Sequence, residues 1–327
     1  MNPLTFHGGQ LSEAKARYAA APEPWIDLST GINPHAWPGA DSMDIDWRRL
    51  PEERDLRDLE RAAARHFGVD PVHVAALPGT EIGLRLLGRL LPGPARYGWP
   101  AYRTHAEIFP DARPLASADE TPASGGILLL ANPNNPDGIE HDAATLLAHL
   151  DRQEALHGWL VIDEAFADAD PGISLAAHVA DDRKLLIFRS FGKYFGLAGL
   201  RLGFIIGPVS LVAQIRTLLG SWPVSAAAIA IGTAAYRDEA WIATMREQLP
   251  AEAAALDALF DSYGLRSAGK CPLFRLIETG EAGAIFERLA AQAILTRPFD
   301  YNPRWLRIGL PGTVEARLRL DRALAHG

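Results

Sequence analysis

The stretch RSFGKYFGLAGLRLGF, residues 189–204, decides the fold of this chain. It directly follows an apolar segment, KLLIF, that is typical of a buried β-strand. Lys193 lies in a Ser-x-x-Lys turn directly after this strand, three residues after Ser190 and eight residues before Arg201. A hydroxyl, an amine and a guanidinium at this spacing suit a cofactor with an aldehyde and a phosphate, because a lysine amine bonds covalently to an aldehyde. The alternative is a solvated lysine in a glycine-rich turn, so the assignment of Lys193 to a cofactor depends on further segments of the chain.

The middle of the chain alternates short apolar runs with helical patterns. The runs are rich in leucine and β-branched residues and lie at 74–77, 127–133, 159–166, 185–188 and 202–207. Between them EIGLRLLGRLL and DAATLLAHLDRQEAL carry apolar residues at helical spacing. This alternation predicts βαβ units and therefore an α/β fold with a mostly parallel sheet, in a large domain of residues 38–237.

The pattern changes from about Asp238. A long helical segment, MREQLPAEAAALDALFDSYG, is followed by strand-like KCPLFRLI, helical AGAIFERLAAQ, strand-like AILTRPF and WLRIGL, and helical VEARLRLDRALA. This order predicts a small α+β domain of residues 238–327. We expect the N-terminal arm, residues 1–37, to complete it.

Composition restricts the class of protein. The 327 residues give room for about two domains, and the net charge of -8 argues against binding to nucleic acid. The N-terminus lacks a basic start followed by an apolar block, and no apolar run approaches the roughly 20 residues that span a bilayer, so we expect a cytoplasmic protein without membrane contact. The single cysteine, Cys271, excludes an internal disulfide and a cysteine-based zinc site, and no metal is expected. Cys271 itself is interpreted as a buried small apolar residue.

Two polar residues follow apolar runs, at the strand ends where open α/β sheets bind their ligands. Asp163 ends the run LVID, and an acid there would suit a protonated pyridine nitrogen, whose charge helps the ring to accept electrons. A helix N-cap or a structural ion pair is the alternative for Asp163. Asn135, in ANPNNPDG, could donate its amide to the cofactor's phenolic oxygen, although turn chemistry alone also explains an asparagine there.

Two further segments fit the same cofactor. Gly79 and Thr80 follow the run HVAAL and begin a helix, whose free amides would bind a phosphate together with the Thr80 hydroxyl; a plain N-cap would look the same. Tyr102, in GWPAYRTH, could stack on a flat ring or could be an ordinary core aromatic. Together with Ser190, Lys193 and Arg201, these residues predict pyridoxal 5'-phosphate as the cofactor.

In this order along the chain, these residues resemble the fold-type I pyridoxal-phosphate enzymes of the aspartate aminotransferase superfamily. The segments NPNNPDG, VIDEAF and SFGKYFGLAGLRLG are similar to the histidinol-phosphate aminotransferase branch, and the likeness covers nearly the whole chain. The opening segments FHGGQL and WIDLSTGINPHAWP are similar to the start of threonine-phosphate decarboxylases of cobalamin synthesis.

The resemblance implies a homodimer and a small substrate that carries both a carboxylate and a phosphate. Arg307, in WLRIGL, matches the family's arginine for the substrate carboxylate, and Arg297, in ILTRPF, matches an arginine for the substrate phosphate. Guanidinium groups contact such anions through two hydrogen bonds at once. His7 and Asn33 of the N-terminal arm are candidates for closing over the phosphate, although an arm histidine can also be merely solvated.

The chain departs from the family pattern at two positions. Phe166 replaces the tyrosine that usually bonds the phenolic oxygen, so Asn135 would do this alone. Leu56 is the nearest match to the tyrosine that usually reaches across the dimer to the cofactor phosphate. Threonine-phosphate decarboxylases tolerate phenylalanine at the first of these positions.

The resemblance therefore implies decarboxylation of L-threonine O-3-phosphate to (R)-1-amino-2-propanol O-2-phosphate, with Lys193 and Asp163 as catalytic residues. A histidinol-phosphate or related class I/II aminotransferase is the alternative on the same fold. A non-catalytic ligand-binding relative is the alternative from another class, but it would have lost the lysine or carry a fused DNA-binding segment.

Overall fold

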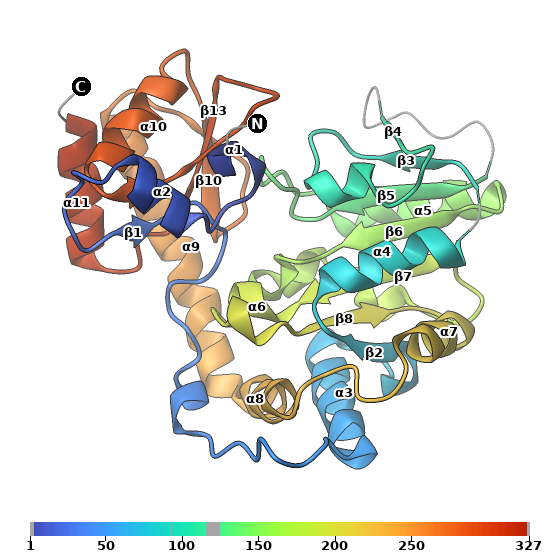
Figure 1. Cartoon of the computed structure of the whole chain (residues 1–327). Helices are drawn as coiled ribbons and strands as arrows, with labels where there is room; N and C mark the ends of the chain where they lie inside the picture. The colour runs from blue at the N-terminus through green and yellow to red at the C-terminus, as the bar shows by residue number, and fades with distance from the viewer. Residues whose placement is uncertain (1–2, 92, 116–124, 326–327) are drawn as a thin grey trace. The chain divides into compact units, whose positions relative to one another are not determined.

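A computed structural model describes residues 3–91, 93–115 and 125–325 of the chain (Figure 1). It divides into two compact units. Unit 1 comprises Met1–His35, Pro136–Ile139 and Met245–Gly327, and unit 2 comprises Ala36–Asn135 and Glu140–Thr244. Neither boundary coincides with the expected limits at 37/38 and 237/238.

Unit 2 is built on a sheet that has seven strands among the described residues, in the order β2-β8-β7-β6-β5-β3-β4. Only β8 runs antiparallel to its neighbours β2 and β7; the other adjacent pairs are parallel. The predicted mostly parallel sheet is therefore confirmed. The strands are β2 (Val74–Leu77), β3 (Ala95–Tyr97), β4 (Arg113–Pro114), β5 (Ile127–Ala131), β6 (Trp159–Asp163), β7 (Leu185–Ser190) and β8 (Gly203–Ile206).

Helices cover this sheet, and its strands are accordingly continuous apolar runs. Every residue of β2, β5 and β8 is buried, as expected where both faces of a sheet are covered. In Figure 1 α4 and α7 lie on the near side of the sheet, and their leucines join strand residues in one apolar cluster. The helices of unit 2 are α3 (Glu53–Phe67), α4 (Thr80–Leu90), α5 (Ala143–Ala155), α6 (Phe191–Tyr194), α7 (Val209–Leu219), α8 (Ala226–Arg237) and the first residues of α9 (Glu239–Ser262).

Unit 1 holds a second, antiparallel sheet with the order β12-β13-β10-β9 and a parallel pair, β1 with β11. Its strands are β1 (Ile26–Asp27), β9 (Ser267–Ala268), β10 (Phe274–Glu278), β11 (Ile294–Leu295), β12 (Arg297–Pro298) and β13 (Trp305–Gly309). Its helices are α1 (Pro3–Phe6), α2 (Leu11–Arg17), α10 (Ala282–Ala291), α11 (Val314–Ala325) and the remainder of α9. The N-terminal arm belongs to this unit, because β1 pairs with β11.

Cys271 lies just before β10 and is fully buried, as predicted. Across the parts of the chain that the structure describes, no helix is long and apolar enough to cross a membrane. The same residues contain no cluster of three or more His, Cys, Asp or Glu side chains that could hold a metal ion.

Candidate active site

Unit 2 has a pocket of about 170 Å³ at the carboxyl ends of its parallel strands. β5, β6 and β7 end at this pocket, in agreement with the rule that open α/β sheets bind ligands beyond the carboxyl ends of their strands. The pocket brings together all eight residues predicted to contact the cofactor: Gly79, Thr80, Tyr102, Asn135, Asp163, Ser190, Lys193 and Arg201.

One end of the pocket is suited to an anion. Gly79 caps α4 with a φ of 88°, and a Cβ atom there would lie 2.7 Å from Nη2 of Arg201. Only glycine therefore lets this guanidinium approach the start of α4. Gly203 permits a second close approach, because its Cβ would lie 2.8 Å from the Thr80 amide nitrogen. Helix amides and a guanidinium converging with the Thr80 and Ser190 hydroxyls are what a phosphate monoester requires.

Asp163 supplies a carboxylate to the pocket. It ends β6, and only 7% of its surface is exposed. Its Oδ1 accepts from the Ala165 amide at 3.2 Å, and its Oδ2 lies 3.1 Å from Nε2 of His105. Both oxygens are thus oriented by the protein, while the residue still faces the pocket. A pyridinium nitrogen fits this environment, because a buried carboxylate is costly unless a positive group or hydrogen bonds stabilise it.

Sequence reasoning missed His105. This histidine is buried in a 3₁₀ turn, η3 (Arg103–Ala106), 58 residues before its partner Asp163. Its ring also meets the Tyr102 ring edge to face, with centroids 5.7 Å apart. The sequence offered one signal for His105: it lies three residues after Tyr102, which was predicted to contact the cofactor, and neighbours of a contact residue are close to the same site.

Lys193 lies in the first turn after β7, half-buried in the pocket wall. Its Nζ is 5.8 Å from the centre of the Phe166 ring, within the range of a cation–π contact. Gly192 keeps this turn tight, because a Cβ there would lie 2.6 Å from Cα of Ala198. The amine is therefore held at the pocket by a rigid turn.

Asn135 lies in a loop that Asn132 closes. The Asn132 side chain is fully buried, accepts from the His141 amide at 2.9 Å and donates to the His141 carbonyl at 3.1 Å. These two hydrogen bonds join the beginning of the loop, at Asn132, to its end, at His141. They hold in place the loop backbone that positions Asn135 in the pocket wall.

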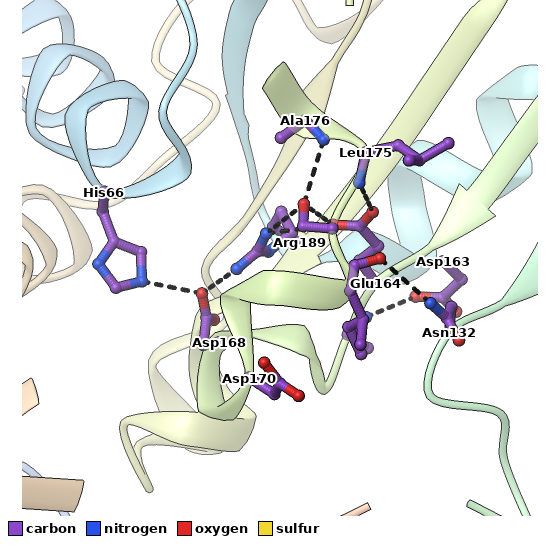
Figure 2. A network of polar contacts seen from close by, with 12 residues as sticks. His66, Asn132, Asp163, Glu164, Asp168, Asp170, Leu175, Ala176 and Arg189 are labelled. Carbon is purple, nitrogen blue, oxygen red and sulfur yellow. Dashed lines mark hydrogen bonds and ion pairs between the residues drawn. The ribbon is translucent and has the colours of Figure 1, made fainter. Parts of the chain in front are cut away.

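Behind the pocket lies a buried network of charges (Figure 2). Arg189 donates through Nη1 to Glu164 at 3.1 Å and to the Ser174 hydroxyl at 3.2 Å, and through Nη2 to Asp168. His66, from α3, contacts Asp168 at 3.0 Å. Glu164 follows Asp163 in the sequence and Arg189 precedes Ser190. The network therefore ties together the strand ends that carry two pocket residues.

The two carboxylates of this network differ in their pKa. Burial raises the pKa of Glu164, and the charge of Arg189 offsets this only in part. Burial acts in the same direction on Asp168, but the charge of Arg189 and the hydrogen bond with His66 outweigh it and lower the pKa of Asp168 to about 2. Asp168 is thus the firmly ionised partner of Arg189.

Unit 1 contains the four residues predicted to bind substrate. Arg297 and Arg307 are register partners on the adjacent antiparallel strands β12 and β13, and both are buried. Burial, followed by the positive charge of Arg297, lowers the pKa of Arg307. Two buried guanidinium groups side by side repel one another, so an anion bound there would relieve the repulsion.

The N-terminal arm packs close to Arg307. Nη2 of Arg307 donates to the Ser29 carbonyl at 2.9 Å, and the Gly9 amide donates to the Ser29 hydroxyl at 2.8 Å. Gly8 touches the same residue so closely that a Cβ would lie 2.3 Å from the Ser29 carbonyl oxygen. His7, half-buried, directly precedes this contact. The His-Gly-Gly opening thus has a packing reason within unit 1.

Asn33 is buried further along the arm, and its Oδ1 accepts from the His35 amide at 2.9 Å. That hydrogen bond is of the kind that stabilises a turn.

Comparison with known proteins agrees with this geometry. The family model for aminotransferase class I and II matches residues 96–320. The chain belongs to this family. Within this family, a threonine-phosphate decarboxylase from a Sinorhizobium species is 40% identical and covers 100% of this chain and 99% of the relative. A threonine-phosphate decarboxylase from Pseudomonas aeruginosa is 38% identical, with 97% and 96% covered.

Solved structures show the same fold. The histidinol-phosphate aminotransferase from Sinorhizobium meliloti, solved in complex with pyridoxal-5'-phosphate, has a TM-score of 0.80 at 20% identity and covers 100% of this chain and 96% of that one. The L-threonine-O-3-phosphate decarboxylase from Porphyromonas gingivalis has a TM-score of 0.75 at 18% identity, with 91% and 98% covered. At these identities the likeness establishes the fold alone, and it confirms the predicted fold class.

Proposed function

We propose that this protein is a pyridoxal-phosphate-dependent lyase that decarboxylates L-threonine O-3-phosphate to (R)-1-amino-2-propanol O-2-phosphate in cobalamin biosynthesis. The observation that carries the proposal is the buried pair Arg297 and Arg307 on adjacent strands. A substrate with one carboxylate needs one guanidinium, whereas a phosphorylated amino acid gives each arginine an anion. The full-length relatives named threonine-phosphate decarboxylase support the same substrate.

In this proposal the residues of the unit 2 pocket would hold the cofactor. Lys193 would bond to its aldehyde, Asp163 would pair with its ring nitrogen, and Asn135 would donate to its phenolic oxygen. The cofactor phosphate would bind between the start of α4 and Arg201. Once bound, pyridoxal phosphate provides a ring that accepts the electrons released when a bond to the substrate Cα breaks.

Orientation of the substrate selects the bond that breaks. Arg307 binds the carboxylate and Arg297 the phosphate, with His7 and Asn33 closing over the phosphate. Two fixed anions leave the Cα substituents little freedom to rotate, and the Cα bond that lies perpendicular to the ring is the one that breaks. In the proposed reaction this is the bond to the carboxylate: it breaks, carbon dioxide leaves and Cα takes up a proton. We assign delivery of this proton to Nζ of Lys193.

Asp163 keeps its role throughout the reaction. Its carboxylate is oriented by His105 and by the Ala165 amide, and its negative charge would pair with the ring nitrogen. A charge-assisted hydrogen bond of this kind is roughly twice as strong as a neutral one. This contact would keep the proton on the ring nitrogen.

A class I/II aminotransferase acting on histidinol phosphate or a related amine is the alternative. A histidinol-phosphate aminotransferase from Cupriavidus pinatubonensis is 35% identical over 97% of this chain, which supports it. The same Lys193 and Asp163 would serve, but the bond from Cα to hydrogen would be held perpendicular to the ring. Product analysis separates the two reactions, because only decarboxylation releases carbon dioxide.

A homodimer and a cytoplasmic location complete the proposal. The homodimer is what the family resemblance implies, and the cytoplasmic location is what the N-terminal sequence and the lack of a long apolar run indicate. The proposal is tested by incubating the purified holoenzyme with threonine phosphate and measuring carbon dioxide and aminopropanol phosphate together. Carbon dioxide without added threonine phosphate, or a keto acid in its presence, would contradict the proposal.

A further inference from the structure

We propose that Glu81 is a positioning residue that fixes the ring of Tyr102 for stacking on the cofactor. The inference rests on the proposed function, because Tyr102 has a ring to stack on only when pyridoxal phosphate occupies the pocket. All residues that carry the argument belong to unit 2 and line or adjoin the pocket.

The Glu81 carboxylate receives three side chains. Its Oε2 accepts from the Tyr102 hydroxyl at 3.1 Å and from the Thr104 hydroxyl at 2.8 Å. Its Oε1 accepts from Nε of Arg85 at 2.6 Å. Tyr102 and Thr104 belong to the loop and turn after β3, whereas Glu81 and Arg85 are on α4. The carboxylate therefore joins the loop that carries the stacking ring to the helix that begins at the phosphate end.

An acid at this place requires an explanation. The start of α4 is where we expect the cofactor phosphate, and two negative groups near each other are unfavourable. Arg85, four residues later on the same helix, offsets the charge of Glu81, and it also contacts Glu107 at 2.9 Å. A carboxylate whose only role was a favourable interaction with the helix dipole would need no hydrogen bond from a side chain of another segment. Glu81 instead binds two hydroxyl groups from the loop, so its position is determined by Tyr102 and Thr104.

The hydrogen bond fixes the second end of the Tyr102 ring. At one side the ring meets His105 edge to face, and His105 in turn contacts Asp163. At the hydroxyl end Glu81 prevents rotation of the side chain between rotamers. The ring is thus set between the residue for the ring nitrogen and the helix for the phosphate. This also explains a tyrosine at a position where a phenylalanine would offer an equally flat ring but no hydroxyl for Glu81.

A double-mutant cycle on cofactor affinity tests the proposal. The apoenzyme of the wild type, Glu81→Ala, Tyr102→Phe and the double variant is titrated with pyridoxal phosphate, and the dissociation constant is read from the cofactor absorbance. Each single change removes the hydrogen bond between Glu81 and Tyr102, so each should weaken binding about tenfold. Glu81→Ala also releases Thr104 and Arg85, so the double variant should match Glu81→Ala rather than lose affinity a hundredfold. The circular dichroism of the cofactor band should fall in all three variants.

Two further variants separate positioning from general stability. Glu53→Ala on α3 is the matched control, because Glu53 forms the same i,i+4 pair with Arg57 at 2.8 Å in the first turn of a helix but does not line the pocket. It should leave cofactor affinity unchanged. Glu81→Gln retains an acceptor oxygen for the Tyr102 hydroxyl and should recover most of the affinity and of the dichroism.

Three results would overturn the proposal: multiplicative effects of the two changes, an unchanged dichroism in Glu81→Ala, or an equal loss in Glu53→Ala. A wild-type protein that takes up no pyridoxal phosphate would instead contradict the proposed function. A failure of this inference and a failure of that function therefore give different results.

Discussion

Replacing Arg297 with methionine should remove the preference for a phosphorylated substrate. Methionine retains an unbranched apolar side chain, which limits the cavity left beside the Phe299 ring that the guanidinium now contacts at 5.1 Å. Arg297 is 8% exposed, so its contact with a phosphate would be made in a largely desolvated site. A hydrogen bond to a charged group contributes about 1.5 to 3 kcal/mol, and a loss of about 2 kcal/mol corresponds to roughly thirtyfold in kcat/KM.

Arg307 should keep its role in this variant. Its pKa is about 9, so it is protonated at neutral pH with or without the charge of Arg297, and its contact with the carboxylate is retained. The loss should therefore fall on threonine phosphate, while kcat/KM for threonine changes little. Arg307→Met is the matched comparison on the facing strand, and it should reduce kcat/KM for both substrates because both carry a carboxylate.

The assay is steady-state release of carbon dioxide from threonine phosphate and from threonine by the holoenzymes. We expect the ratio of the two kcat/KM values to fall about thirtyfold in Arg297→Met and to remain near the wild-type ratio in Arg307→Met. Removal of the first ten residues, which include His7, should lower the ratio in the same direction. An equal loss for both substrates in Arg297→Met would refute the assignment of Arg297 to the phosphate.

Three other predictions concern the pocket and the network behind it. Borohydride reduction of the holoenzyme followed by peptide mapping should place the cofactor label on Lys193, and a label elsewhere would disprove its role. Asp163→Ala removes a contact worth about 1.5 to 3 kcal/mol and should lower turnover more than tenfold at saturating cofactor, whereas a near-normal rate would make the carboxylate purely structural. Asp168 has a pKa of about 2 in the folded state, below its unfolded value, so its ionised form stabilises the fold above pH 4 and this contribution, about 2 kcal/mol, is lost as the pH falls toward 2. Urea unfolding between pH 5 and pH 2 should therefore show a steeper loss of stability in the wild type than in Asp168→Asn, and equal slopes would contradict the ion pair with Arg189.

Much of the fold could be predicted from the sequence because its strands are buried on both faces. β5 and β6 read as uninterrupted apolar runs, and each is followed by polar residues that the parallel arrangement brings to one edge. Most of the eight pocket residues were predictable for the same reason, since they end or follow a strand or begin a helix, whereas Arg201 lies just before β8. The antiparallel direction of β8 relative to β7 could not be predicted, because the residues of an apolar run do not show which way the strand runs in the sheet.

Contacts between distant side chains could not be predicted. His105 and His66 meet their carboxylates across 58 and 102 residues, and nothing local marks either histidine as a partner. The role of Glu81 was hidden in another way, because an acid in the first turn of a helix is already explained by the helix dipole. Similarly, the short segment Pro136–Ile139 of unit 1 interrupts unit 2 without any change in composition.

The proposed reaction breaks the bond from Cα to the carboxylate in a substrate that carries a phosphate. L-threonine O-3-phosphate labelled with carbon-13 in the carboxyl group, incubated with holoenzyme in a closed vessel, shows whether this bond breaks. We expect the label in carbon dioxide, in equal amount to the aminopropanol phosphate formed. Label retained in a keto acid, with no labelled carbon dioxide, would contradict it and would establish the aminotransferase reaction instead.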